Sequence, residues 1–235
     1  MEEDEGVAGG INDVSTGEPD SFTAYRIFTA WLALDIVLWA FIYLSTGRGS
    51  ETLAYIAVIV VSFSFLYRLM RRSHYTGGPL VFLLAILFMS LFEEYMAYSV
   101  GGGLHGKATS LAEDWIMSVP SFVGLGIGSL LARNILGANR EDVYLGGAIT
   151  GVTVEVLLSF LLSPDHGFMS LLASLVAFGG YAGWLYSALS SLPILEYPRK
   201  TPSRVISPFI TSFLVLTCSL AMNFAGFVSA TLLGV

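Results

Sequence analysis

Cysteine, histidine and charged residues are scarce in this chain of 235 residues. The single cysteine, Cys218, excludes an internal disulfide and any metal site built from several thiolates. Charged side chains make up only 12% of the sequence, about half the fraction usual in soluble domains. The few Lys and Arg residues form no basic face of the kind that binds nucleic acid, so we expect no nucleic-acid partner.

Apolar residues dominate the composition, since 54% of the sequence is hydrophobic. Apolar runs of about twenty residues recur along the chain, and this length spans the hydrocarbon core of a bilayer. We therefore predict an all-α integral membrane protein with one domain, residues 22–235, in contact with membrane lipid. Its seven transmembrane helices are expected at 24–45, 52–70, 79–100, 115–136, 144–163, 168–192 and 205–233.

The first 21 residues differ in composition from the rest. They contain no Lys or Arg, many small residues, and seven acids: Glu2, Glu3, Asp4, Glu5, Asp13, Glu18 and Asp20. Such a segment cannot bury enough apolar surface to fold, so 1–21 is predicted to be an acidic, disordered N-terminal tail. It lacks the basic segment followed by an apolar stretch that marks a signal peptide.

Basic residues indicate the orientation in the membrane. Between the predicted helices, Arg48 and Lys107 lie on one side, and the other nine bases lie on the opposite side: Arg26, Arg68, Arg71, Arg72, Arg133, Arg140, Arg199, Lys200 and Arg204. Basic loops stay in the cytoplasm, so the N-terminus is expected inside and the C-terminus outside. This asymmetry favours a cytoplasmic-type membrane, either an inner or a plasma membrane.

Five polar residues interrupt the apolar runs of outward-directed helices: Asp35, Glu93, Glu94, Glu155 and Asn223. At 1.5 Å per residue, four of them lie about 9 to 15 Å from the outer ends of their helices. Charged groups in such segments are costly and usually mark a pathway or a reaction site. We therefore predict that Asp35, Glu94, Glu155 and Asn223 bind a substrate or ion in one outward-facing pocket.

The polar positions also suggest an internal repeat. An offset of 129 residues aligns Glu94 with Asn223, and an offset of 120 aligns Asp35 with Glu155. Two units of three helices, joined by the fourth helix, would form a parallel repeat of the kind that transporters use.

The adjacent pair Glu93 and Glu94 is the sharpest local motif. Neighbouring helix residues point about 100° apart, so the two carboxyl groups can serve different interfaces. Two close carboxyl groups rarely both ionise and can share a proton, which suits acid–base catalysis as well as proton or cation exchange. The alternative is a structural pair that is solvated or bound to Lys107.

The segment Glu93-Glu94-Tyr-Met-Ala-Tyr98 resembles two families over a few residues. Glutamate-dependent intramembrane proteases carry such a pair, but follow it with a base and place a histidine on another helix. Membrane lycopene cyclases carry a Glu-Glu-aromatic stretch in a similar helix layout. Those cyclases have a proline where this chain has Phe92, and acids in the second repeat where it has Met222 and Asn223. These departures leave the chain unassigned to either family.

Polar residues of the outer loops surround the mouth of the expected pocket: His105, Glu113, Asp114, Asp165 and His166. Glu113 and Asp114 also suit the start of the fourth helix, where negative charge meets the positive end of the dipole. His105 and His166 are weak candidates for divalent-metal ligands, because no H-x-x-x-H spacing accompanies them. No cofactor is predicted.

Two function classes and one structural alternative follow. The carboxylates favour a transporter or channel for a cation or a proton-coupled small solute. The alternative is an intramembrane enzyme, with Glu93 and Glu94 as acid–base groups acting on a lipid, isoprenoid or peptide. The second alternative is a non-catalytic membrane subunit whose acids pair between helices. The sequence is compatible with a homo-oligomer.

Overall fold

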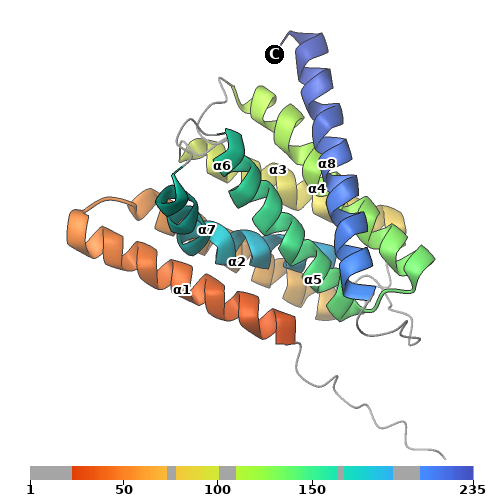
Figure 1. Cartoon of the computed structure of the whole chain (residues 1–235), viewed down its shortest axis with the longest axis horizontal. Helices are drawn as coiled ribbons and strands as arrows, with labels where there is room; N and C mark the ends of the chain where they lie inside the picture. Colours follow the sequence, from red (N-terminus) through yellow and green to blue (C-terminus); the bar gives the residue numbers. More distant parts are fainter. Residues whose placement is uncertain (1–22, 73–77, 101–109, 163–166, 193–206, 235) are drawn as a thin grey trace, which may run out of the picture.

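The computed structural model describes residues 23–72, 78–100, 110–162, 167–192 and 207–234, and in these ranges it contains helices and no strand. The helices are α1 (Thr23–Thr46), α2 (Ser50–Arg72), α3 (Pro79–Ser99), α4 (Leu111–Leu136), α5 (Arg140–Gly151), η2 (Val152–Leu158), α6 (Ser159–Leu162), α7 (Phe168–Ser190) and α8 (Ser207–Leu233). Because α5, η2 and α6 follow one another without a break, they form one rod, and the described residues make seven rods (Figure 1). The all-helical prediction is thus confirmed, while the tail at 1–21 lies outside the described residues.

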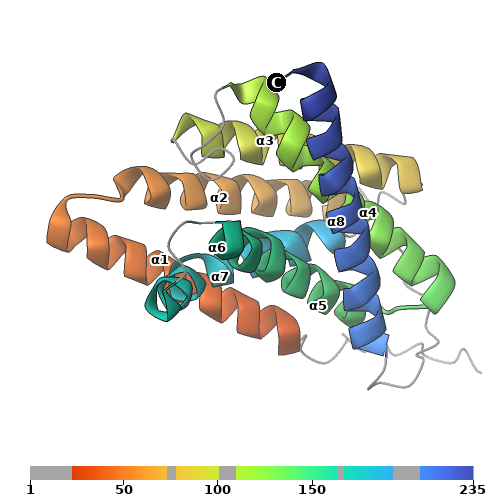
Figure 2. The same cartoon turned by 45° about the horizontal axis from the view of Figure 1, so that its top comes forward.

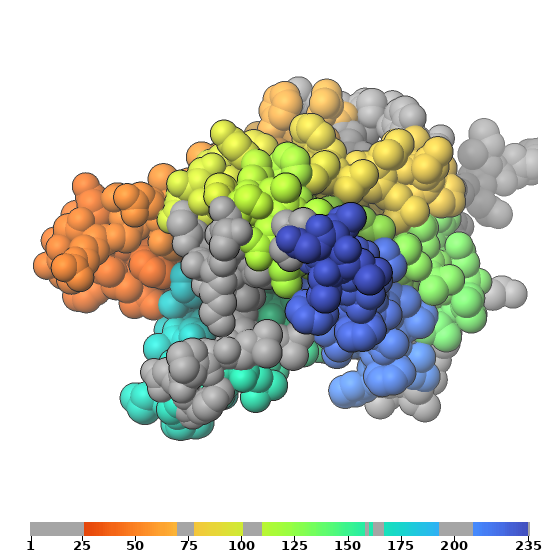
Figure 3. All heavy atoms as spheres, turned by 90° about the horizontal axis from the view of Figure 1, so that it is seen from above, coloured from red at the N-terminus to blue at the C-terminus, as the bar shows by residue number. Residues whose placement is uncertain are grey.

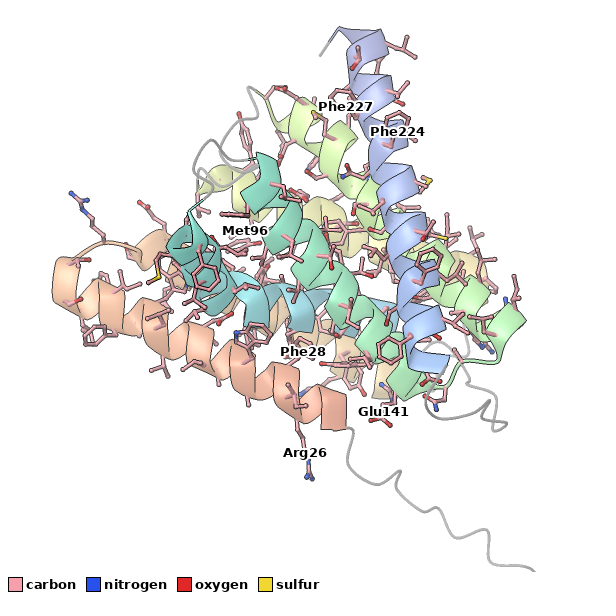
Figure 4. All side chains as sticks on the ribbon, in the orientation of Figure 1. Arg26, Phe28, Met96, Glu141, Phe224 and Phe227 are labelled. Atoms are coloured by element: carbon pink, nitrogen blue, oxygen red, sulfur yellow. The ribbon has the colours of Figure 1, made fainter. Side chains whose placement is uncertain are left out.

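Six helices are long and apolar enough to cross a membrane: α1, α2, α3, α4, α7 and α8. Their apolar side chains are widely exposed, as on α1, where Val37 and Phe41 are 64% and 66% exposed. On α8, Phe224 and Phe227 are likewise exposed (Figure 4). Apolar surface of this extent suits lipid, and the chain is a multi-pass membrane protein. The seventh crossing, the orientation and the repeat stay predictions.

The fifth rod starts earlier than expected and is irregular. Asn139 caps it: its side chain accepts a hydrogen bond from the Asp142 N–H at 2.8 Å, and Asp142 accepts one from the Asn139 N–H at 3.1 Å. This reciprocal capping fixes the start at Arg140 rather than at the predicted residue 144. From Val152 to Leu158 the rod is a π-helix, a rare form that is frequent at functional sites.

Glycines bring the helices into close contact. A Cβ on Gly128 would lie 2.7 Å from the Val215 Cα, so α4 and α8 meet backbone to backbone. Gly147 and Gly151 of α5 face α7 in the same way. The space-filling view shows α8, in blue, lying against α4, in lime to green (Figure 3).

Helix direction alternates along the chain. Arg26 at the start of α1 and Glu141 at the start of α5 lie at the same end of the bundle, whereas Met96 near the end of α3 lies away from them (Figure 4).

A buried apolar core joins α2, α3, α4 and α7 and includes Ile56, Phe82, Phe122 and Leu185. The four acidic side chains described first in the next subsection come from α3, α4 and η2.

Candidate functional site

Four acidic side chains from α3, α4 and η2 interact with one another, and we call them the acidic cluster: Glu93, Glu94, Asp114 and Glu155. Glu93 interacts electrostatically with Glu155 and Asp114, and Glu94 interacts with all three other members. Glu93, Glu94 and Asp114 are only 6%, 7% and 0% exposed. Like charges in a buried place repel strongly, so this arrangement requires protons, cations or strong hydrogen bonds to stabilise it.

Adjacent residues Glu93 and Glu94 reach different neighbours, as their angular separation on α3 predicts. Glu93 points to α2 and α7, where it accepts hydrogen bonds from the Tyr55 and Tyr181 hydroxyls. Glu94 interacts instead with Asp114 of α4. Two carboxyl groups this close rarely both ionise, so a shared proton would stabilise the pair.

Three buried tyrosines surround the acidic cluster: Tyr55, Tyr181 and Tyr186. The Tyr181 hydroxyl lies 2.7 Å from the Tyr55 hydroxyl and 3.1 Å from Glu93 Oε1. The Tyr186 hydroxyl donates to Glu155 Oε1 at 2.6 Å. Phenol hydroxyls next to carboxyl groups form continuous hydrogen-bond chains, and such chains can pass protons.

The sequence reasoning missed these tyrosines. All three lie within helices, Tyr55 on α2 and the other two on α7. The available signal was a tyrosine inside an apolar helix, because a buried phenol hydroxyl normally finds a polar partner.

Asp35, predicted to bind a substrate or ion, is fully buried on α1. Its Oδ2 accepts a hydrogen bond from the backbone N–H of Tyr181 at 2.7 Å. Asp35 therefore reaches the acidic cluster through Tyr181, whose hydroxyl bonds Glu93. The residue aligned with it by the expected repeat, Glu155, binds a phenol instead of a backbone N–H.

Asn223 of α8 donates through Nδ2 to the Met117 carbonyl of α4 at 3.3 Å. Its described hydrogen bond therefore joins α8 to α4. Met117 lies three residues after Asp114, about one helical turn along α4.

The residues predicted at the outer mouth separate into two groups. Ser110 caps α4 by accepting the Glu113 N–H at 3.1 Å, so Glu113 stands in the first turn, as the helix-start alternative expects. Asp114 follows it but is fully buried in the acidic cluster. The predicted His105, Asp165 and His166 lie outside the described residues, as does Lys107.

Basic side chains stay away from the acidic cluster in the described ranges. The arginines whose side chains the structure describes lie within about one turn of a helix end or between helices: Arg26, Arg48, Arg68, Arg133 and Arg140. Among the described residues, no group of three or more His, Cys, Asp or Glu side chains has the arrangement of a metal site. Tyrosine hydroxyls bind two members of the acidic cluster, Glu93 and Glu155.

Two irregular helices border the acidic cluster. Glu155 lies on the π-helix η2, and α7, the helix that carries Tyr181, changes direction along its length (Figures 1 and 2). Interrupted helices beside buried polar groups are typical of the binding sites of membrane transporters.

Comparison of the chain with protein families, with curated proteins and with solved structures found no match.

Proposed function

We propose that this protein is a proton-coupled transporter of a small cation and that the acidic cluster is its binding site. One observation carries the proposal: four carboxyl groups gather in the core of a multi-pass protein, and the described bases stand at helix ends. A buried site rich in carboxyl groups attracts cations and binds protons. A proton shared between Glu94 and Asp114 would represent the proton-loaded state.

Transport would follow from competition between protons and a cation for the same oxygens. When the cluster releases protons to one side, its carboxylates and the tyrosine hydroxyls become oxygen ligands for a cation. Movement at the α7 bend and at η2 would bring these oxygens together, because helices deform most easily where their regular hydrogen bonds are interrupted. Buried Glu93 and Glu94 would represent the occluded step of this cycle.

The distribution of bases gives the direction. With the nine-base side in the cytoplasm, the acidic cluster lies toward the outer ends of α3 and α4. Glu94 is five residues before the end of α3, and Asp114 is the fourth residue of α4, which corresponds to about 5 to 8 Å of helix. We therefore propose that the cation enters or leaves on the outer face of a cytoplasmic-type membrane.

Transport explains the described contacts more directly than catalysis does. Glu93 already binds two tyrosine hydroxyls, so a substrate would first have to displace them. Proton and cation exchange needs only the carboxyl groups themselves.

The test is proton movement in liposomes that contain the purified full chain and a trapped pH-sensitive dye. With the membrane potential clamped, inward gradients of Na⁺, K⁺ or Li⁺ should make the lumen alkaline, because each entering cation replaces a proton. Glu93→Gln and Glu94→Gln should slow this flux by about a hundredfold, since each removes a titratable oxygen from the site. Glu51→Gln, on the exposed first turn of α2, is the matched control and should behave like the wild type.

Two outcomes would overturn the proposal. One is that none of the three cations moves protons in the wild-type protein. The other is that the Glu93→Gln and Glu94→Gln variants transport as fast as the Glu51→Gln control.

A further inference from the structure

Two side chains of α1 bond the backbone of α7 at residues that lie four apart. In an α-helix the Tyr181 N–H and the Ala177 carbonyl face each other, because they are four residues apart. Here the Tyr181 N–H donates to Asp35 Oδ2 at 2.7 Å, and the Ala177 carbonyl accepts from the Trp39 indole N–H at 3.0 Å. Asp35 and Trp39 are four residues apart and share one face of α1. Both backbone groups of this pair therefore have partners on one neighbouring helix.

Close packing fixes α1 against this point of α7. A Cβ on Gly180 would lie 2.6 Å from the Leu32 N, and one on Gly179 would lie 2.5 Å from the Trp31 Cζ2. Only glycines allow this approach, and it leaves Asp35, one turn after Trp31, opposite the Tyr181 backbone. The position of Asp35 relative to α7 is thus set by packing on both sides.

Tyr181 links this contact to the acidic cluster. Its backbone is held by Asp35, while its hydroxyl binds Glu93 Oε1 at 3.1 Å and Tyr55 at 2.7 Å. The ring is only 6% exposed and packs edge-on against Tyr55, with ring centres 5.4 Å apart. A shift of the Tyr181 backbone would therefore move its hydroxyl away from Glu93.

We infer that Asp35 is a positioning residue: it holds the α7 bend so that the Tyr181 hydroxyl binds Glu93, and it is not itself a ligand of the transported cation. This inference rests on the proposed function and reassigns one of the residues predicted to bind the ion. What the role requires of residue 35 is a hydrogen-bond acceptor, and a negative charge is not needed.

The competing role, a cation ligand, makes a different prediction. Asp35 Oδ1 is buried and has no hydrogen-bond partner among the described residues, so a ligand role would use this oxygen and its charge. Asparagine keeps an acceptor for the Tyr181 N–H but removes the charge. Leucine removes both and keeps the branched shape and the number of side-chain heavy atoms. The two substitutions therefore separate the roles.

Two measurements on the full-length Asp35→Asn and Asp35→Leu variants test the inference. The first is hydrogen exchange at the Tyr181 amide in detergent micelles, resolved by fragmentation mass spectrometry. The second is Na⁺-, K⁺- or Li⁺-driven proton flux in liposomes, measured across pH. We expect Asp35→Asn to keep the slow amide exchange, a flux within about twofold of wild type and an unchanged pH profile. Asp35→Leu should exchange this amide at least about tenfold faster and lose the flux.

The outcomes distinguish the inference from the proposed function. If Asp35→Asn loses the flux while the Tyr181 amide stays protected, Asp35 is a ligand, and the inference is wrong although transport stands. If Asp35→Leu keeps the amide protected, the positioning role is also wrong. If the wild type itself moves no protons, the proposed function fails, and the amide exchange still decides the role of Asp35. Should Asp35→Leu not fold, the Asp35→Asn result is sufficient.

Discussion

Replacing Gly124 by alanine should force α4 and α8 apart. A Cβ at Gly124 would lie 2.8 Å from the Ser219 Cα, and ordinary van der Waals contact begins at 3.4 Å. The clash is with backbone atoms, so no flexible side chain can move aside to relieve it. The two backbones must therefore separate by at least about 0.6 Å. The buried hydrogen bond between the Ser121 and Ser219 hydroxyls, now 2.7 Å, lies at the same contact and would lengthen with it.

The expected loss is about 1 to 3 kcal/mol of unfolding free energy, the usual cost of one methyl group too many in a packed interface. Gly146→Ala is the matched control, because Gly146 also faces α8 from within a helix. There a Cβ would lie 3.3 Å from the Thr211 Cγ2, which a small side-chain shift can accommodate. Both variants make the same Gly→Ala change in a helix, so the difference between them isolates the clash.

Unfolding in mixed micelles, with SDS added stepwise and helix content followed by circular dichroism, measures this difference. Gly124→Ala should unfold at a lower SDS fraction than Gly146→Ala, with an unfolding equilibrium constant shifted by roughly 5- to 160-fold. Equal stability of the two variants would refute the close α4–α8 contact.

Two further predictions concern Tyr186 and the orientation. Tyr186→Phe removes the hydroxyl bond to Glu155 and should lower the unfolding free energy by about 1 to 3 kcal/mol in the same assay. The control, Tyr95→Phe on the exposed face of α3, should change it very little. Equal effects of the two substitutions would contradict a structural role of the Tyr186 hydroxyl. In a variant without the native cysteine, a cysteine at Ser50 should react with a membrane-impermeant thiol reagent on intact cells, and one at Glu141 should not. The reverse pattern would invert the proposed orientation.

Several members of the site could be recognised from the sequence because charge inside an apolar run is conspicuous. Glu93, Glu94 and Glu155 were selected in this way, and the structure brings them into electrostatic contact. Asp114 was assigned to the outer mouth because it precedes the apolar part of its helix. The length of α4 and its packing against α3 decide that this side chain is buried.

The partners of these acids could not be predicted, because a hydrogen bond joins residues far apart in the chain. Tyr181 and Tyr55 are separated by 126 positions, and Tyr181 and Asp35 by 146. Hydropathy patterns report which faces are apolar, but not which helix covers each face.

The sequence by itself determined the number and approximate positions of the helical rods, because apolar run length and turn-forming residues are local properties. Only the tertiary structure decided the π-helical form of η2, the bend in α7 and the connection of Asp35 to Tyr181. These features lie where η2 packs against α7 and where α7 packs against α1. Their stability therefore depends on packing between distant segments, which no local pattern contains.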